Sequence, residues 1–215
     1  MAPSAAVAAG TVYDIDSASS LTVVVNKHRP LDPQTYVPAS LTRIQAERLR
    51  SEAAEAYKKM VRDAKADGVN IVAVSGYRSY DTQAGLYDNY VQQYGQATAD
   101  TIAARPGHSE HQTGLAMDVG NSSGVCALQD CFEDTPVGQW VAKNAHTYGF
   151  IIRYPKDEQD VTGYKYEPWH LRYVGPKLAD EMRLKAEATV TKGPKLDTDT
   201  MEEFFDLGSA PDYLK

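Results

Sequence analysis

A single carboxylate interrupts an apolar, strand-like segment of this chain, Leu115-Ala-Met-Asp-Val119. Burying Asp118 in such a segment is unfavourable unless its carboxylate is paired or bound to a metal ion. Gly114 permits a tight turn between His111 and the segment, which then carries Asp118 into the interior. Any fold of this chain must therefore bring a partner for Asp118 to this strand.

Short strand-like runs and helical patterns follow one another without a regular strand–helix–strand repeat. Ser40 and Ser79 are candidate caps of the first two helices, and Pro136 and Gly149 bracket the third. The patterns predict strands at 21–25, 69–75, 115–119, 150–154 and 170–174, and helices at 40–67, 80–94, 135–148 and 176–188. This order favours an α+β domain with a small, mostly antiparallel sheet flanked by helices.

The chain of 215 residues is long enough for one domain with a substantial core. From composition we expect a flexible N-terminal tail over residues 1–20, one folded domain over 21–190 and a C-terminal tail over 191–215. The C-terminal tail is expected to pack through Phe204, Phe205 and Tyr213. The first residues lack the charged leader and long apolar run of a complete signal peptide.

The charge balance excludes several kinds of partner. The formal net charge is -7, and nucleic acids or anionic membranes require a concentrated basic surface instead. No stretch has the roughly 18 to 20 apolar residues that span a bilayer. We therefore expect neither nucleic-acid binding nor a transmembrane segment.

Two cysteines, Cys126 and Cys131, lie close together in the chain. A zinc-ribbon half-site is disfavoured, because no second Cys or His pair follows at ribbon spacing. A small loop disulfide is the favoured interpretation, and it indicates an oxidising, exported location. Two reduced thiols are the remaining alternative.

Two histidines and Asp118 form a candidate metal site. His111 lies seven residues before Asp118, and His170 lies in a second apolar segment, Tyr166-Glu-Pro-Trp-His170. Two His and one Asp are a plausible set of three zinc ligands that leaves one position open for water. Glu167, three residues before His170, is a candidate base that takes a proton from that water. Pro168 favours an extended backbone at Glu167, so this is not the helical His-Glu-x-x-His arrangement.

Other interpretations of these residues stay open at this point. Any one of the histidines, taken alone, is more often structural, because histidine commonly hydrogen-bonds backbone groups. Two His and one carboxylate are also the facial triad of non-haem iron oxygenases. That alternative ranks lower, because the chain lacks the many regular short strands of a jelly roll.

Three motifs carry a family resemblance. The segment Ser109-Glu-His-Gln-Thr-Gly-Leu-Ala-Met-Asp118 matches the Ser-x-His-x-x-Gly-x-Ala-x-Asp pattern of the VanY-like D-alanyl-D-alanine carboxypeptidases. Glu167-Pro-Trp-His170 matches that family's Glu-x-Trp-His pattern, and Ser75-Gly-Tyr-Arg-Ser-Tyr-Asp-Thr-Gln83 resembles its Ser-Gly-Tyr-Arg-Ser segment with the following Gln. The resemblance spans about Asn26 to Gly175 and implies a hedgehog/D-Ala-D-Ala-peptidase-like fold.

The resemblance also implies a metal centre and a base. One Zn2+ ion would be held by His111, Asp118 and His170, and Glu167 would act as the general base. No residue at these positions departs from the family's pattern. Since the related hedgehog-type signalling domains show that such a scaffold can serve binding alone, the fold does not by itself guarantee catalysis.

The resemblance further implies a substrate pocket. Arg78, Gln83 and Ser109 would bind the substrate near its scissile end, and Arg78 offers fixed, always-charged donors to the terminal carboxylate or to the developing oxyanion. Tyr154 and Trp169 are expected to wall this pocket, although aromatic residues in such positions are as often part of a core.

The resulting hypothesis is a zinc carboxypeptidase, acting as a monomer outside the cytoplasm on peptidoglycan stem peptides that end in D-alanine. The motifs do not separate a D-Ala-D-Ala carboxypeptidase from an L,D-carboxypeptidase or an endopeptidase on cell-wall peptides. A non-catalytic peptidoglycan-binding or signalling module on the same scaffold is the alternative from another class. Glu167 argues against such a module, because a binding site has no need of a base.

Overall fold

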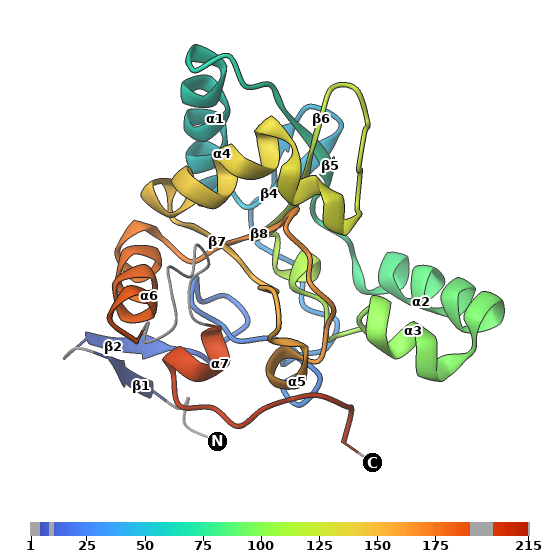
Figure 1. Cartoon of the computed structure of the whole chain (residues 1–215). Helices are drawn as coiled ribbons and strands as arrows, with labels where there is room; N and C mark the ends of the chain where they lie inside the picture. Colours follow the sequence, from blue (N-terminus) through green and yellow to red (C-terminus); the bar gives the residue numbers. More distant parts are fainter. Residues whose placement is uncertain (1–4, 9–10, 190–199, 215) are drawn as a thin grey trace.

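The structure, a computed structural model of the chain (Figure 1), describes residues 5–8, 11–189 and 200–214. Its centre is a four-stranded antiparallel sheet with the order β5-β6-β8-β7. These strands are β5 Ile71–Ser75, β6 Ala116–Asn121, β7 Phe150–Ile152 and β8 His170–Tyr173. Two small hairpins accompany it: β1 Ala5–Ala8 with β2 Thr11–Asp14, and β3 Thr42–Ile44 with β4 Glu47–Leu49. The expected α+β class with a small antiparallel sheet is confirmed.

Seven helices accompany the sheet in the described residues, and two of them, coloured green, stand away from it to one side (Figure 1). The seven helices are α1 Ser51–Ala66, α2 Tyr80–Tyr94, α3 Gln96–Ile102, α4 Pro136–Asn144, α5 Gln159–Thr162, α6 Pro176–Thr189 and α7 Met201–Phe204. Three short 3-10 helices are η1 Glu110–Thr113, η2 Asp130–Asp134 and η3 Ala145–Tyr148. No helix in the described part of the chain is long and apolar enough to cross a membrane.

Side-chain alternation gives the sheet two different faces. Met117 and Val119 of β6, and Leu171 and Tyr173 of β8, belong to the main apolar core with α1 and α4. Residues between them in each strand point to the opposite face. Asp118 and the polar residues of β8 therefore share the face that turns away from this core.

The helix expected from Ser40 to Asp67 is only partly correct, because α1 begins at Ser51. Residues 42–49 form the hairpin β3–β4 instead, with Gln45 at a positive φ of 53° in its turn. The hairpin supports the loop after β5, since the Tyr77 N–H donates to the Arg48 carbonyl at 2.8 Å. The hairpin thus takes the place of the first expected helical turns, and local periodicity does not encode the long-range contact that accompanies it.

The strand expected at 21–25 is wrong: most of this segment is buried, but it has no strand structure. The flexible tail expected over residues 1–20 is wrong for residues 11–20, because Tyr13, Ile15 and Ala18 are buried in apolar clusters. Residues 1–4 and 9–10 of that tail, and 190–199 and 215 of the C-terminal one, lie outside the described residues.

The expected packing of the C-terminal segment is confirmed. Phe204 and Phe205 are buried against α6, and the Tyr213 ring lies 5.0 Å from the ring of His108, measured between centroids. The remaining expected strands and helices agree with the structure within a few residues, whereas the hairpin β1–β2 and the short helices α3, α5 and α7 were not expected.

Candidate active site

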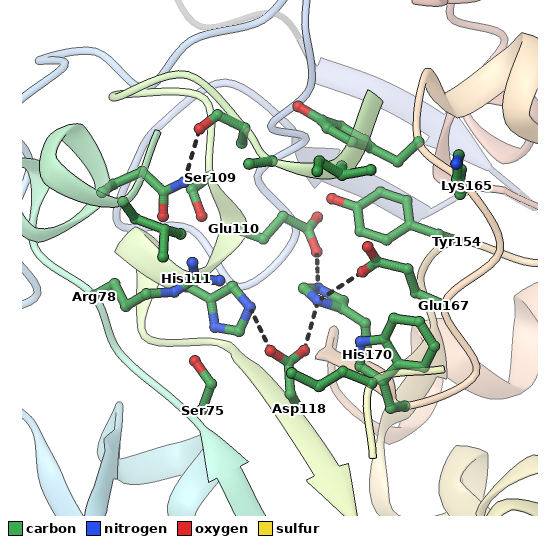
Figure 2. A pocket seen from close by; sticks show the side chains of 18 of the residues that line it. Ser75, Arg78, Ser109, Glu110, His111, Asp118, Tyr154, Lys165, Glu167 and His170 are labelled. Atoms are coloured by element: carbon green, nitrogen blue, oxygen red, sulfur yellow. Dashed lines mark hydrogen bonds and ion pairs between the residues drawn. The ribbon is translucent and has the colours of Figure 1, made fainter. Parts of the chain in front are cut away.

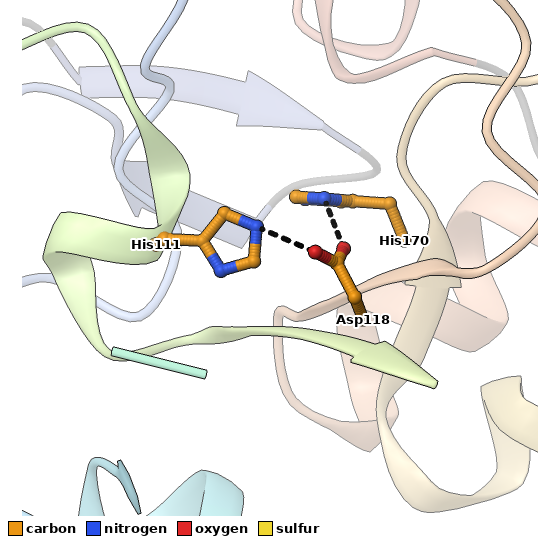
Figure 3. A group of neighbouring side chains, drawn as sticks. All are labelled: His111, Asp118 and His170. Carbon is orange, nitrogen blue, oxygen red and sulfur yellow. Dashed lines mark ion pairs between the residues drawn. The ribbon is translucent and has the colours of Figure 1, made fainter. Parts of the chain in front are cut away.

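Strand pairing brings Asp118 and His170 together. They are direct partners in the antiparallel register of β6 and β8, and Ser75 of β5 is opposite Asp118 on the other side. Directly opposed residues on one face have Cβ atoms only about 5 Å apart. The Asp118 Oδ1 accordingly lies 3.1 Å from the Nδ1 of His170 (Figure 3).

His111 reaches the same point from the 3-10 helix η1. This helix ends at Gly114, whose φ of 69° lies in the left-handed region and turns the chain into β6. The His111 Nδ1 lies 2.8 Å from the carbonyl oxygen of Gly76, which can only accept, so Nδ1 carries a proton. The bare Nε2 of the neutral ring then faces the Asp118 carboxylate at 3.3 Å.

The outer nitrogen of His170 has its own partner. The His170 Nε2 lies 3.3 Å from the Glu110 Oε2, which directs the Nδ1 of the ring toward Asp118 (Figure 2). A hydrogen bond to one ring nitrogen of this kind fixes the orientation of a metal-binding imidazole. The side chains of His170 and Glu110 are almost completely excluded from solvent.

These donors fit a divalent cation. One ligand atom each from His111, Asp118 and His170 lie within 4.8 Å of one another, and all three residues are buried. The Asp118 Oδ1 is buried without a well-aligned hydrogen bond, although His170 lies near it. Two imidazoles and a carboxylate that converge with unshared electron pairs are the donor set typical of zinc.

In the metal-free site the electrostatics of His111 and Asp118 agree with this arrangement, whereas those of His170 favour a protonated ring whose proton a metal ion must displace. Burial and the nearby Arg78 guanidinium lower the pKa of His111, which favours the neutral ring that binds metals. Burial alone would raise the pKa of Asp118, but His111 and His170 beside it bring this pKa well below its usual range. Burial opposes the charged form of His170, yet its contacts with Asp118 and Glu110 raise the pKa to about 9.

Glu167 lies beside this set. Its Oε2 is 3.7 Å from the His170 Nδ1, and its side chain lines the cavity above the three ligands (Figure 2). Burial raises the pKa of Glu167 to about 7, even though His170 opposes the shift. A carboxylate with such a pKa is suited to accept and return a proton near neutral pH.

One cavity of about 460 Å³ is lined by every residue that the sequence analysis named as a candidate for metal binding, catalysis or substrate binding. Arg78 and Gln83 lie in its wall, and the Arg78 Nε and Gln83 Oε1 are buried without a hydrogen-bond partner in the described chain. The Gln83 Nε2 donates to the Ala104 carbonyl at 2.7 Å, which holds the amide in place. Buried polar atoms without partners are rare, so a polar ligand is the natural partner for these two.

The other three candidates occupy different parts of the wall. Ser109 lines the cavity just before η1 and is buried. The ring of Tyr154 lies 4.9 Å from that of His170, measured between centroids. Trp169 lines the cavity and also packs into the main core, so it serves both interpretations given above.

Sequence reasoning missed a group of buried charges behind the ligands. Glu110, Arg153 and Arg172 have fully buried side chains, and both arginines donate to the Glu110 Oε1. A signal was available, because Arg153 and Arg172 interrupt apolar strands in the same way as Asp118 does. The argument applied to Asp118 would have identified them as paired charges.

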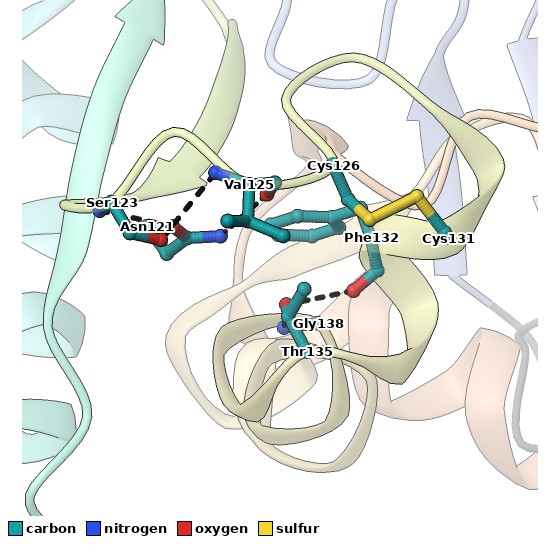
Figure 4. Close-up of a disulfide and its surroundings, with 8 residues drawn as sticks. All are labelled: Asn121, Ser123, Val125, Cys126, Cys131, Phe132, Thr135 and Gly138. Atoms are coloured by element: carbon teal, nitrogen blue, oxygen red, sulfur yellow. Dashed lines mark hydrogen bonds between the residues drawn. A yellow bond between two sulfur atoms is a disulfide. The ribbon is translucent and has the colours of Figure 1, made fainter.

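The cysteines form the expected disulfide between Cys126 and Cys131 (Figure 4), so the zinc-ribbon and free-thiol alternatives are wrong. Leu128 and Asp130, which lie between the cysteines, line the cavity. Phe132 follows the loop and is fully buried in the main core. The disulfide loop therefore forms one wall of the cavity, which the sequence did not indicate.

The fold and the site define a class: small α+β proteins with a buried His–Asp–His set and an adjacent glutamate in one cleft. A model of the D-alanyl-D-alanine carboxypeptidase family, VanY, matches residues 46–176. The chain belongs to this family. Membership disfavours the iron oxygenase, whose jelly roll the four-stranded sheet does not resemble.

Known relatives cover most of this chain. A putative carboxypeptidase of Bacillus subtilis (strain 168), YodJ, is 47% identical over 175 residues, which are 77% of this chain and 64% of the relative. The structure of the LD-carboxypeptidase LdcB superposes with a TM-score of 0.79 at 40% identity, covering 96% of this chain and 95% of that one. A variant of the D,D-pentapeptidase VanY in complex with Zn(II) has a TM-score of 0.69 at 31% identity, covering 87% and 99%. The chain thus spans less than two thirds of the length of the Bacillus relative.

Proposed function

We propose that this chain is a zinc-dependent carboxypeptidase that removes the C-terminal D-alanine from peptidoglycan stem peptides. The observation that carries the proposal is the convergence of His111, Asp118 and His170 on one point, with Glu167 beside them in a cavity. The names of the relatives, which are carboxypeptidases, support the same reaction class.

Zinc is the proposed cofactor, with one ion held by the His111 Nε2, an oxygen of Asp118 and the His170 Nδ1. The buried donor set and the relative solved with Zn(II) support this choice. When bound, zinc lowers the pKa of a water molecule and polarises the scissile carbonyl.

Glu167 is the proposed general base and acid. It takes a proton from the attacking water and afterwards delivers the proton to the leaving amine of D-alanine. Its position 3.7 Å from His170 and its pKa of about 7 support both steps.

Substrate recognition is assigned to Arg78, Gln83 and Ser109, with Tyr154 and Trp169 as walls. Burial lowers the pKa of Arg78, but the nearby carboxylates of Asp118 and Glu167 favour its charged form, so the guanidinium carries its charge inside the cavity. A guanidinium at this place binds the terminal carboxylate or stabilises the oxyanion that develops during attack.

An L,D-carboxypeptidase is the second candidate, and one observation favours it. The structural likeness to LdcB, an LD-carboxypeptidase, covers 96% of the chain at 40% identity, compared with 87% at 31% for the D,D-pentapeptidase VanY. Both reactions release D-alanine, and they differ in the residue that precedes it. An endopeptidase and a non-catalytic binding module are less favoured alternatives.

The proposed place of action is outside the cytoplasm, in the cell-wall space. The disulfide Cys126–Cys131 supports this location, because disulfides persist in oxidising compartments. We also propose that the chain acts as a monomer, since residues of one chain form the whole cavity.

The test measures release of D-alanine from pentapeptide and tetrapeptide stems, with and without a zinc chelator. Chelator-sensitive release from the pentapeptide alone supports the D,D reaction, and release from the tetrapeptide supports the L,D reaction. Glu167→Gln is the matched variant: it should keep zinc and lose on the order of 100-fold or more in kcat, as expected for a missing general base. Parental turnover by this variant would refute the role of Glu167, and the absence of release from both stems would refute the proposed function.

A further inference from the structure

A cluster of buried charges joins the zinc site to the C-terminal part of the chain. Glu110 Oε1 accepts from the Arg153 Nε at 2.8 Å and from the Arg172 Nη1 at 2.6 Å. Arg153 also donates two parallel bonds to Glu202, at 2.9 Å from Nη1 and 2.7 Å from Nη2. The side chains of all four residues are completely buried.

Glu202 belongs to α7, which lies outside the residues that match the family model. The helix lies beside α6 (Figure 1), and Met201 and Phe204 share an apolar cluster with Leu178, Ala179 and Met182 of α6. Glu202 is therefore part of a packed element. Asn26, from the N-terminal part of the chain, donates to the Glu202 Oε1 at 2.8 Å. The Glu202 carboxylate therefore accepts from the charged Arg153 and the neutral Asn26, which fix its position.

The contacts form a continuous path. Glu202 orients the Arg153 guanidinium, whose remaining Nε–H reaches Glu110, and the other oxygen of Glu110 faces the His170 Nε2 at 3.3 Å. We propose that Glu202 is a positioning residue that acts through Arg153 and Glu110 to hold His170 in the orientation that binds the metal. This inference rests on the zinc site proposed above.

The physical reason is charge balance in a buried environment. Two arginines and two glutamates compensate one another here, and a buried charge left without its partner is strongly unfavourable. Without Glu202, Arg153 loses its bidentate clamp and both arginines compete for Glu110 alone. Glu110 is then drawn away from His170, and a loosened outer contact weakens metal binding by an imidazole.

The test compares Glu202→Gln with Glu203→Gln. Glu203 is the neighbouring residue and caps α7 by accepting from Thr200, so its substitution perturbs the same helix without touching the cluster. Zinc affinity, measured by competition with a chromophoric chelator, should fall about tenfold for Glu202→Gln and remain near parental for Glu203→Gln. Equal affinities of the two variants, or equal losses, would overturn the proposal.

A double-mutant cycle separates positioning from packing. Because Glu202 acts through Arg153, the loss caused by Glu202→Gln should disappear in an Arg153→Met background, and an additive loss would overturn the path. If Glu202→Gln does not fold, Arg153→Lys decides, since one ammonium cannot bridge both glutamates as the guanidinium does. Parental zinc affinity of Arg153→Lys would then overturn the proposal.

The outcomes also distinguish this inference from the proposed function. Failure of the parental protein to bind zinc would refute the zinc site itself. Zinc binding by the parental protein together with unchanged affinity of Glu202→Gln would refute only the role of Glu202. As a second readout, kcat for D-alanine release by Glu202→Gln is measured at saturating zinc. This kcat should be closer to the parental value than the zinc affinity is, because excess metal fills a weakened site.

Discussion

The Nδ1 of His111 lies 2.8 Å from the carbonyl oxygen of Gly76, and this contact decides which nitrogen of the ring faces Asp118. Gly76 packs directly against the β3–β4 hairpin because it has no side chain. A Cβ at this position would lie 2.5 Å from the backbone oxygen of Arg48 in the β3–β4 hairpin. The hairpin, the loop after β5 and the metal site are thus mechanically connected through one glycine.

Gly76→Ala should therefore weaken zinc binding. The new methyl group must displace backbone, which shifts the carbonyl acceptor of His111, and losing such an outer contact lowers metal affinity about tenfold to 100-fold. Gly85→Ala is the matched control, since a Cβ at Gly85 of α2 meets nothing within 4 Å. The control should be stabilised by about 0.5–1 kcal/mol with unchanged zinc affinity. Parental zinc affinity of Gly76→Ala would contradict the prediction.

Glu110→Gln should destabilise the fold strongly, because it leaves Arg153 and Arg172 without their shared carboxylate. Burial alone would raise the pKa of Glu110, but Arg172 and Arg153 bring it well below its usual range, so the residue is charged at neutral pH. Breaking a buried ion pair by removing one partner costs about 3–5 kcal/mol in free energy of unfolding. Urea unfolding of the metal-free protein measures this loss.

Glu133→Gln is the control for that experiment. Glu133 pairs with Lys156 on the surface, where both side chains are partly exposed. Such pairs contribute only about 0–1 kcal/mol. Similar losses of unfolding free energy in Glu110→Gln and Glu133→Gln would show that the buried ion pairs stabilise the fold no more than a surface pair does.

Loss of the disulfide should affect substrate binding more than zinc binding. Leu128 and Asp130, which lie between the two cysteines in the chain, line the cavity, and the disulfide (Figure 4) closes the loop that carries them. Ordering a loosened side chain on binding costs about 1 kcal/mol, which corresponds to about fivefold in KM. Cys126→Ser/Cys131→Ser should show the raised KM with near-parental kcat and no response to reductant. An unchanged KM would exclude this loop from substrate binding.

Alkaline pH should loosen the pair of helices beside the cavity. Burial, followed by the hydrogen bond to Asp100, raises the pKa of Tyr87 to about 12, and the bond joins α2 to α3 at 2.6 Å. A raised pKa means that this stability is fully present below the ordinary tyrosine value of about 10 and is lost as the pH rises through about 12. Tyr87→Phe should lose about 1 kcal/mol at neutral pH and show a flatter alkaline decline. Parallel pH profiles of the two proteins would contradict this assignment.

The sequence predicted the site better than it predicted the local structure around it. Asp118 shows why: a charged residue in an apolar strand indicates a buried partner, whatever the details of the fold. Arg153 and Arg172 carry the same signal, but it was not used for them. The motif residues could be assigned because their chemistry and spacing are local. The helix expected from Ser40 failed, since the apolar positions Ile44 and Leu49 fit a hairpin equally well.

The sequence by itself determined the α+β class, the three ligand candidates, the adjacent glutamate and the disulfide. Only the tertiary structure decided that Gly76 fixes His111, that Glu110 faces His170 and that Glu202 closes the charge cluster from a distant helix. These contacts join residues separated by 35, 60 and 49 positions. Local propensity and periodicity act over a few residues, so they cannot specify which distant groups meet when the sheet pairs and the helices pack.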